Sequence, residues 1–255
     1  MKTFINSFKS ILFMMLKSEI LSVVKDQKNG LKNINLGISR EHIKEIKLND
    51  SFAYVISGIR RCGKSTLLHQ IRVNQKDYAY FNFEDTRLNN FRVEDFEKLK
   101  ECLLEIYGKT NTFFFDEIQN IKKWELFIRQ LLDNKAKILI TGSNASLLSK
   151  ELGTRLTGRN LRKELFPFSY KEYLKFKSQK QNFNSFEEYL VNGGFPDYLK
   201  YKNEEILQEL LNNTLYRDIV VRHRLKESKT LKDLTLYLLS NIGKEYSYNS
   251  LKKNF

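Results

Sequence analysis

The sequence predicts an α/β protein, a three-layer sandwich around a mostly parallel five-stranded sheet, followed by a helical region. Two observations favour this class. Short apolar runs alternate with helix-like stretches as far as Pro167, and several runs are apolar throughout rather than alternately polar. Continuous apolar runs are typical of parallel strands that are buried on both faces. Beyond Pro167 the apolar spacing is helical and no strand pattern follows.

The expected elements follow one another along the chain. Strands are predicted for FAYVIS (52–57), YAYFNF (78–83), TFFFDE (112–117), KILITG (137–142) and NLRKELFPF (160–168). Apolar residues at helical spacing predict intervening helices at 65–75, 92–107 and 122–133. Later helices are expected at 169–178, 185–191, 203–226 and 230–242, with the turn sequence NGGFP among them.

The composition indicates a globular chain with an excess of positive charge. Of 255 residues, 41% are hydrophobic and 13% aromatic, which excludes the disordered and fibrous classes. The formal net charge of +14 makes a polyanion such as nucleic acid a candidate partner. The codon bias of an AT-rich genome produces the same lysine excess, so the charge alone leaves this partner open.

The cysteines and the N-terminus indicate neither a metal cluster nor a membrane anchor. Cys62 and Cys102 are isolated in the sequence, which suits a reducing cytoplasm. The apolar patch at residues 11–16 is too short for a membrane span and lacks a cleavage site. We expect it either to begin an amphipathic helix or to precede a true start at Met14 or Met15.

The stretch SGIRRCGKST, residues 57–66, fits G-x-x-x-x-G-K-[ST] between a predicted strand and a predicted helix. In such a phosphate loop, glycines let backbone N–H groups converge on the β-phosphate, and the next helix directs its positive end at the anion. The lysine neutralises phosphate oxygens and the following hydroxyl holds Mg²⁺. The expected nucleotide-binding residues are Gly58, Ile59, Arg60, Arg61, Cys62, Gly63, Lys64, Ser65 and Thr66, with Ser65 also a metal ligand.

An acidic pair, Asp116 and Glu117, ends the strand-like run TFFFDE. In P-loop ATPases an acidic residue at such a strand end binds Mg²⁺, so we expect Asp116 to be the second metal ligand. Glu117 is expected to polarise the attacking water as general base. One strand intervenes between the loop and this pair, which indicates the branch of P-loop ATPases that depends on a catalytic glutamate.

Polar residues at two further strand ends are candidates for catalytic roles. Asn82 is placed to hold Glu117 aside until a partner binds, although a simple turn at the strand end explains it equally well. The run ITGSN ends in polar residues suited to sensing the γ-phosphate and the water. Asn144 and Ser143 are the preferred sensors, and the sequence does not decide between them.

These pieces together resemble the AAA+-like P-loop ATPases of bacteria and archaea that carry a G-x-R-R-x-G-K-S/T loop. The matching segments are GIRRCGKST, FFFDEIQN, ITGSN, ELFPFSYKEYL, GGFP and LYRDIVVRH, in the order and spacing of that family. The resemblance covers about residues 40–255 and implies a P-loop NTPase fold that binds ATP and Mg²⁺.

The resemblance also implies a domain order. We expect an N-terminal helical extension (1–45), a P-loop ATPase domain (46–167), a helical lid (168–228) and the start of a winged helix (229–255). The family's usual layout continues through the winged helix to a C-terminal nuclease-like domain, so the chain is expected to be truncated relative to its relatives.

An arginine that stabilises transition-state charge is implied by the same family. Such ATPases receive it from a neighbouring subunit or from the lid. Arg155 and Arg159 are the first candidates, and Arg217 and Arg222 in the lid are the second. A solvated basic loop explains the first two equally well.

Two functional hypotheses result. The first is an ATP-binding, Mg²⁺-dependent ATP-hydrolysing switch that acts on an unidentified client. We expect ATP rather than GTP because of the resemblance and because the sequence has no N-K-x-D motif. The second is a nucleic-acid-binding or regulatory module with a structural or vestigial nucleotide site, which draws on the charge of +14. We expect a cytoplasmic protein whose partners include a protein client, further copies of the chain or nucleic acid, and no membrane.

Overall fold

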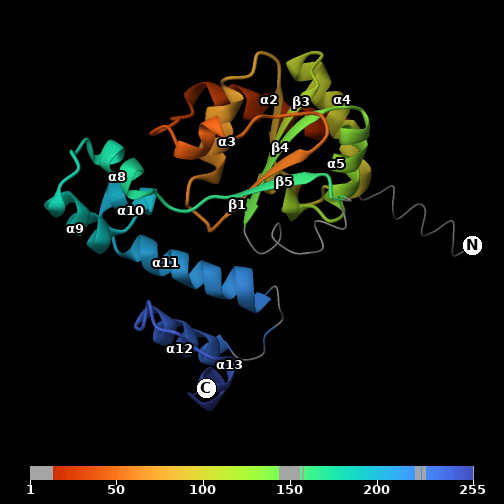
Figure 1. Ribbon diagram of the computed structural model, residues 1–255. Helices are drawn as coiled ribbons and strands as arrows, with labels where there is room; N and C mark the ends of the chain where they lie inside the picture. The colour runs from red at the N-terminus through yellow and green to blue at the C-terminus, as the bar shows by residue number, and fades with distance from the viewer. Residues whose placement is uncertain (1–13, 144–155, 157, 222–224, 226–227, 255) are drawn as a thin grey trace, which may run out of the picture. The chain divides into compact units, whose positions relative to one another are not determined.

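The computed structural model describes residues 14–143, 156, 158–221, 225 and 228–254 (Figure 1). The chain divides into two compact units, with the boundary between Leu199 and Lys200. The first unit contains a sheet with its covering helices and a small group of further helices. The second unit is built from helices.

The first unit is built around a five-stranded sheet with the order β2-β3-β4-β1-β5. Every neighbouring pair of strands in it is parallel. The α/β class and the parallel five-stranded sheet are therefore confirmed. The strands are β1 (Ala53–Gly58), β2 (Ala79–Asn82), β3 (Thr112–Asp116), β4 (Lys137–Ser143) and β5 (Asn160–Glu164).

Alternate strand residues pack into two different helical layers. Phe113 and Phe115 lie in one buried cluster with residues of α2, α4 and α5, whereas Phe114 lies in a second cluster with residues of α3. Successive side chains of a strand point to opposite faces, so an entirely apolar strand needs a layer on each side. The helices are α2 (Lys17–Gly30), α3 (Lys64–Arg72), α4 (Phe96–Tyr107) and α5 (Trp124–Asp133).

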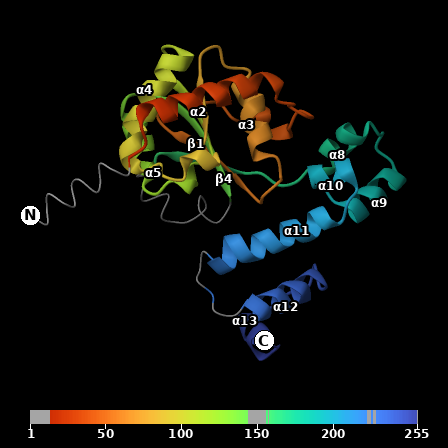
Figure 2. The same cartoon turned by 180° about the vertical axis from the view of Figure 1, so that it is seen from behind.

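Helix α2 belongs to the core of the first unit. Its Ile20, Val23 and Val24 are buried in the cluster that contains the strand residues, and Figure 2 shows it beside α4 on the same face of the sheet. Its Gln27 side chain exchanges two hydrogen bonds with the backbone of Asn82 at the end of β2. The expected domain boundary at residue 45 therefore does not coincide with a division in the structure.

Three short helices follow the sheet in the first unit and pack around Phe168, Tyr173 and Leu199. They are α8 (Tyr170–Lys177), α9 (Phe183–Asn192) and α10 (Pro196–Tyr201). A Cβ at Gly194 would lie 2.2 Å from the carbonyl oxygen of Phe168, so this close approach requires glycine. The expected boundary at residue 167 marks the end of the sheet, whereas the compact unit continues to Leu199.

The second unit contains α11 (Glu205–Asn213), the π-helical segment η6 (Thr214–Val221), α12 (Ser228–Leu239) and α13 (Tyr248–Asn254). The assignment of its last helices to a winged helix stays a prediction. Short 3₁₀ turns complete the described elements: η1 (Leu31–Asn33), η2 (Glu41–Lys44), η3 (Thr86–Leu88), η4 (Val93–Asp95) and η5 (Ile118–Asn120). Among the described helices, none combines the length and the apolar character that crossing a bilayer requires.

Truncation of Phe115 tests the sheet core. Phe115 is fully buried and packs against the rings of Phe83 and Phe127. Phe115→Ala is expected to lower the free energy of unfolding by about 3–5 kcal/mol, because it removes buried contacts and leaves a cavity. Phe183→Ala, at a site that is 73% exposed, is the control and should change it by at most about 0.5 kcal/mol. Urea unfolding followed by circular dichroism measures both; equal losses would contradict the packing described.

Candidate functional site

The phosphate loop, residues 58–66, runs from the carboxyl end of β1 into the first turn of α3. A Cβ at Gly58 would lie 2.3 Å from the carbonyl oxygen of Leu165. Gly63 has φ 96°, in the left-handed region that favours glycine. The amides of the first helical turn lack acceptors within the helix, and they form the part of α3 that binds anions most readily. The loop therefore has the local geometry of a phosphate cradle.

Several loop side chains are directed to protein partners. Cys62 is fully buried, and burial raises the pKa of its thiol. The guanidinium of Arg61 pairs with Asp197 of α10, with Nη1 2.9 Å from Oδ2. Cys62 and Arg61 therefore offer a nucleotide mainly their backbone groups in this arrangement. Ile59, Arg60, Ser65 and Thr66 are half-buried.

Lys64 lies across the loop. It is 6% exposed, and its Nζ donates to the carbonyl oxygens of Gly58 at 3.1 Å and Ile59 at 3.2 Å. The same atom is 3.8 Å from Oε1 of Glu117. One ammonium group therefore contacts the loop and approaches one member of the acidic pair, and its phosphate-neutralising role stays a prediction.

Asp116, at the end of β3, is a buried carboxylate surrounded by hydroxyl groups. It is 3% exposed and accepts a hydrogen bond from the hydroxyl of Thr141, and the hydroxyls of Ser65 and Tyr80 lie close enough to influence its pKa. Burial raises the pKa of Asp116 to about 6, and the bonds from Thr141 and Ser65 act in the opposite direction. The structure thus brings together the two side chains predicted to hold the metal, Ser65 and Asp116.

Glu117 occupies a left-handed backbone conformation, with φ 51°. Its amide donates to the hydroxyl of Thr141 at 3.2 Å, and its carboxylate accepts a hydrogen bond from the side-chain amide of Gln119. Gln119 lies in the turn η5, which brings it back towards Glu117. Sequence reasoning missed this contact because nothing in the spacing of two residues predicts the turn.

Asn82 differs from its expected role. Its side-chain oxygen accepts a hydrogen bond from the amide of Glu84 at 2.8 Å, which closes a turn at the end of β2. The side-chain amide that donates to the carboxylate of Glu117 belongs to Gln119 and not to Asn82. The turn interpretation of Asn82 is therefore the one that the geometry supports.

The end of β4 lies beside the loop, since Ser143 pairs with Gly58 in the parallel ladder. This register puts the backbone of Ser143 at the edge of the sheet where Asp116 also ends. The structure describes the backbone of Ser143 but not its side chain, and Asn144 lies outside the described residues. Both sensor assignments stay predictions.

Arg159 lies at the opposite edge of the sheet. Its carbonyl accepts from the amide of Ala53, the first residue of β1, and its Nη1 is 2.5 Å from Oδ1 of Asp133. At about 3.3 Å per strand residue, this position is more than about 15 Å from the loop of the same chain. Arg159 therefore does not reach the phosphate loop of its own chain, and its catalytic role stays a prediction. Arg155 and Arg222 lie outside the described residues, as does the side chain of Arg217.

The residues at this edge fit a magnesium ion bound together with a nucleotide. The hydroxyl of Ser65 and the carboxylate of Asp116 are oxygen ligands that lie near each other at this edge. Mg²⁺ in nucleotide sites is typically held by one or two such protein groups, while phosphates and waters complete its coordination.

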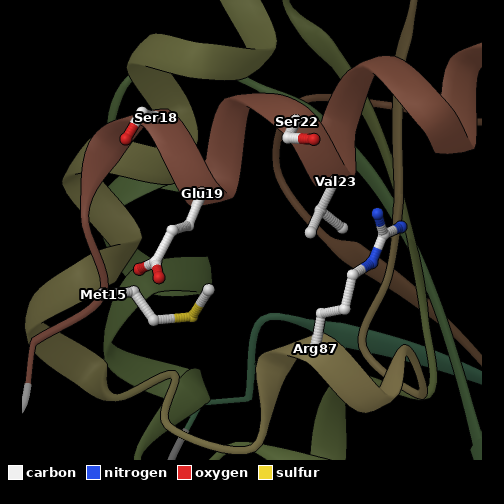
Figure 3. A pocket seen from close by; sticks show the side chains of 6 residues that line it. All are labelled: Met15, Ser18, Glu19, Ser22, Val23 and Arg87. Atoms are coloured by element: carbon white, nitrogen blue, oxygen red, sulfur yellow. The ribbon is translucent and has the colours of Figure 1, made fainter.

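A cavity of about 420 Å³ lies beside the amino-terminal half of α2 (Figure 3). Its charged side chains have partners in the fold: Glu19 accepts from the amide of Leu16, and Arg87 pairs with Asp26 and Asp85. Residues of the phosphate loop and the acidic pair are not part of its lining, which is formed by Met15, Ser18, Glu19, Ser22, Val23 and Arg87.

The buried carboxylate of Asp116 should have a measurable effect on stability. Its pKa in the folded protein, about 6, lies above the ordinary 3.8. Between pH 3.8 and pH 6, the folded state therefore keeps a proton that the unfolded state has released. The stability that this proton contributes is present below about pH 4 and is lost as the pH rises through 6. Asp116→Asn should therefore raise the free energy of unfolding at pH 7.5 by about 2–3 kcal/mol, with the gain shrinking towards pH 4.

Denaturant unfolding without nucleotide or metal, at both pH values, measures this gain. Comparing the two proteins at each pH cancels the titration of all other groups. Asp133→Asn at the surface is the control, with an expected change within about 1 kcal/mol at either pH. A loss of stability from Asp116→Asn that is the same at both pH values would contradict the assignment.

Comparison with known families identifies two regions of the chain. Residues 50–174 match a family model described as an AAA domain. This range contains all five strands, the phosphate loop and the acidic pair. Residues 183–255 match a model described as a domain of unknown function, DUF8612.

Two curated relatives are uncharacterized proteins of Methanocaldococcus jannaschii and Haemophilus influenzae. The first is 39% identical over 225 residues, which is 81% of this chain and 51% of the relative. The second is 34% identical over 225 residues, which is 81% of this chain and 56% of the relative. The chain therefore spans about half the length of the curated relatives it matches.

Among solved structures, the chain is similar to the AMPPCP-bound DnaA of Aquifex aeolicus, with 16% identity, a TM-score of 0.42, and coverage of 85% of this chain and 74% of DnaA. It is also similar to the Walker-type ATPase PABY2304 of Pyrococcus abyssi, with 16% identity and a TM-score of 0.43. This match covers 80% of this chain and 84% of PABY2304.

The sheet order, the loop geometry and the family match describe the same region of the molecule. The parallel strands carry a glycine-containing loop and an acidic strand end to one edge, and the AAA-domain match spans that whole region. Residues 50–174 of the chain are therefore an AAA domain of the P-loop ATPase type.

Proposed function

We propose that this protein binds ATP with Mg²⁺ and hydrolyses it as a switch that acts on a client. The observation that carries the proposal is the convergence of four groups at one edge of the sheet: the loop, Lys64, the Ser65–Asp116 pair and Glu117. Cation, hydroxyl and two carboxylates in contact beside a helix N-terminus suit a nucleotide's phosphates and their metal. A cytoplasmic location and an arginine supplied by a neighbouring copy remain part of this proposal.

Binding starts from the loop. The amides of the first turn of α3 donate to phosphate oxygens, and Lys64 exchanges the carbonyls of Gly58 and Ile59 for the same anions. Ser65 and Asp116 would hold Mg²⁺, and the ion would supply positive charge to offset that of the phosphates. The raised pKa of Asp116 favours a bound cation, because the cation restores the ionised carboxylate in a site where burial disfavours it.

Hydrolysis needs a base next to the attacking water. Glu117 accepts the proton from that water when its carboxylate leaves the amide of Gln119. The side-chain bond to Gln119 therefore opposes turnover, and a client or neighbouring subunit that draws Gln119 away raises the rate. The bond between Gln119 and Glu117 is the observation that favours a switch over a constitutive enzyme.

Two substitutions separate binding from turnover. Lys64→Ala should weaken binding of the fluorescent analogue mant-ATP with MgCl₂ by about 10- to 100-fold, because a charge-assisted contact to phosphate is lost. Glu117→Gln should bind mant-ATP with unchanged affinity and lose about 10²- to 10⁴-fold in ATP turnover, because an amide cannot accept the proton.

Lys17→Ala, which removes an exposed lysine 48% accessible on α2, controls for loss of one positive charge. Equilibrium titration and phosphate release measure the two effects. Lys64→Ala with wild-type affinity would exclude the proposal, and so would Glu117→Gln with wild-type turnover.

A second candidate function rests on the charge of +14. Nucleic acid bound through phosphate contacts gives an association constant that falls steeply as salt rises, with a log–log slope of about −0.9 for each phosphate neutralised on duplex DNA. Fluorescence anisotropy of a labelled duplex from 50 to 300 mM KCl measures this slope. A slope near zero would exclude the second function and leave the first unaffected.

A further inference from the structure

Arg40 is a buried cation between the phosphate loop and the helices α8–α10. Its side chain is 2% exposed, and a buried charge needs close partners. Each of its three nitrogens donates to a protein oxygen: Nε to Glu172 at 2.8 Å, Nη1 to the carbonyl of Cys62 at 2.7 Å and Nη2 to the carbonyl of Phe166 at 2.7 Å. The guanidinium carbon lies 5.1 Å from the centre of the Phe168 ring.

The bond to Cys62 controls the direction of a loop amide. The peptide bond between Cys62 and Gly63 is trans, so its N–H points opposite to its C=O. Because Nη1 of Arg40 holds that carbonyl, the N–H of Gly63 points away from Arg40. Gly63 permits this contact, since a Cβ there would lie 2.9 Å from Nη1. Backbone N–H groups with a fixed direction bind an anion at less conformational cost, so holding this peptide favours phosphate binding.

Glu172 connects Arg40 to helix α8. Its side chain is 3% exposed, and Oε1 accepts both from Arg40 and from the amide of Glu41. Oε2 accepts at 3.0 Å from the amide of Ser169, the N-cap of α8. Removal of one partner of a buried ion pair leaves an uncompensated charge. The start of α8 and the loop amide are therefore linked through two buried side chains.

We propose that Arg40 is a positioning residue of the phosphate loop, and that Glu172 couples nucleotide affinity to the position of α8. The proposal rests on the nucleotide site described under the proposed function. Arg40 acts through the loop rather than on the nucleotide, because each of its nitrogens is bonded to a protein oxygen. The exposed pair of Arg61 and Asp197 joins the loop to α10 as well, but solvent makes such a pair weak.

Nucleotide affinity is the first measurement. Arg40→Lys keeps the charge but loses the fork that reaches three oxygens at once, and Glu172→Gln keeps the shape but removes the anion. Both variants should bind mant-ATP with MgCl₂ about 10- to 100-fold more weakly than the wild type, because the loop is no longer held in the binding geometry. Each protein is titrated at a temperature where circular dichroism reports it folded.

Alkylation of Cys62 by iodoacetamide, without nucleotide, is the second measurement. Cys62 and Cys102 are both fully buried, and Cys102 lies on α4 in the opposite layer. If Arg40 holds the loop, both variants should raise the alkylation rate of Cys62 by about 10-fold or more and leave that of Cys102 within about 2-fold, because only the loop opens more often. Peptide mass spectrometry separates the two sites.

Asp95→Asn is the matched control, because Asp95 is also a fully buried carboxylate that pairs with a cation, Lys98, and accepts a backbone amide bond at a helical turn. It should lower stability and leave mant-ATP affinity and the Cys62 rate unchanged.

Wild-type affinity in both variants would overturn the inference. A parallel rise in the Cys62 and Cys102 rates would also overturn it, since that indicates general destabilisation. If Arg40→Lys does not fold, Glu172→Gln decides the question. If the wild type itself does not bind mant-ATP, the proposed function fails, and the Cys62 rate alone decides whether Arg40 holds the loop.

Discussion

Parallel pairing of β3, β4 and β1 is the constraint on which the site depends. Because these strands run in the same direction, their carboxyl ends meet at one edge of the sheet. There Gly58 pairs with Ser143, and Asp116 follows Phe115, which pairs with Ile140. Packing of alternate residues into two different layers prevents a slip by one residue, which would exchange the two faces. The loop and the acidic pair consequently meet, although fifty positions separate Thr66 from Asp116 in the chain.

Charged groups buried at this edge of the sheet lower the stability of the fold. Asp116 is buried enough for its pKa to rise despite hydroxyl donors, and Lys64 is buried with loop carbonyls as its hydrogen-bond partners. A fold optimised for stability alone would place apolar groups here. Carboxylates with perturbed pKa values are typical of functional sites. In the proposed site, a bound cation would offset the unfavourable burial of Asp116.

The helices after the sheet contribute to the site although they supply none of its predicted ligands. Glu172 caps α8 and binds Arg40, and Arg40 binds the loop. A displacement of α8 therefore has a direct route to the loop amides. Gln119 acts on the acidic pair in a similar way, because it bonds the carboxylate of Glu117 that is proposed to activate water. Under the proposed function, Arg40 would control nucleotide binding and Gln119 would control turnover.

The strands and helices could be predicted from the sequence alone, and so could the residues that we expect at the site. Continuous apolar runs specified strands buried on both faces, and local spacing specified the loop, because helix N-termini and glycine turns are properties of neighbouring residues. Three features came from the tertiary structure: α2 is part of the core, Asn82 closes a turn while Gln119 contacts Glu117, and Arg159 lies at the far edge. It also decided the partners of Arg40, which come from positions 62, 166 and 172. Contacts between residues so far apart in the sequence depend on how the sheet and the helices pack. The spacing of apolar residues predicts the elements but does not predict that packing.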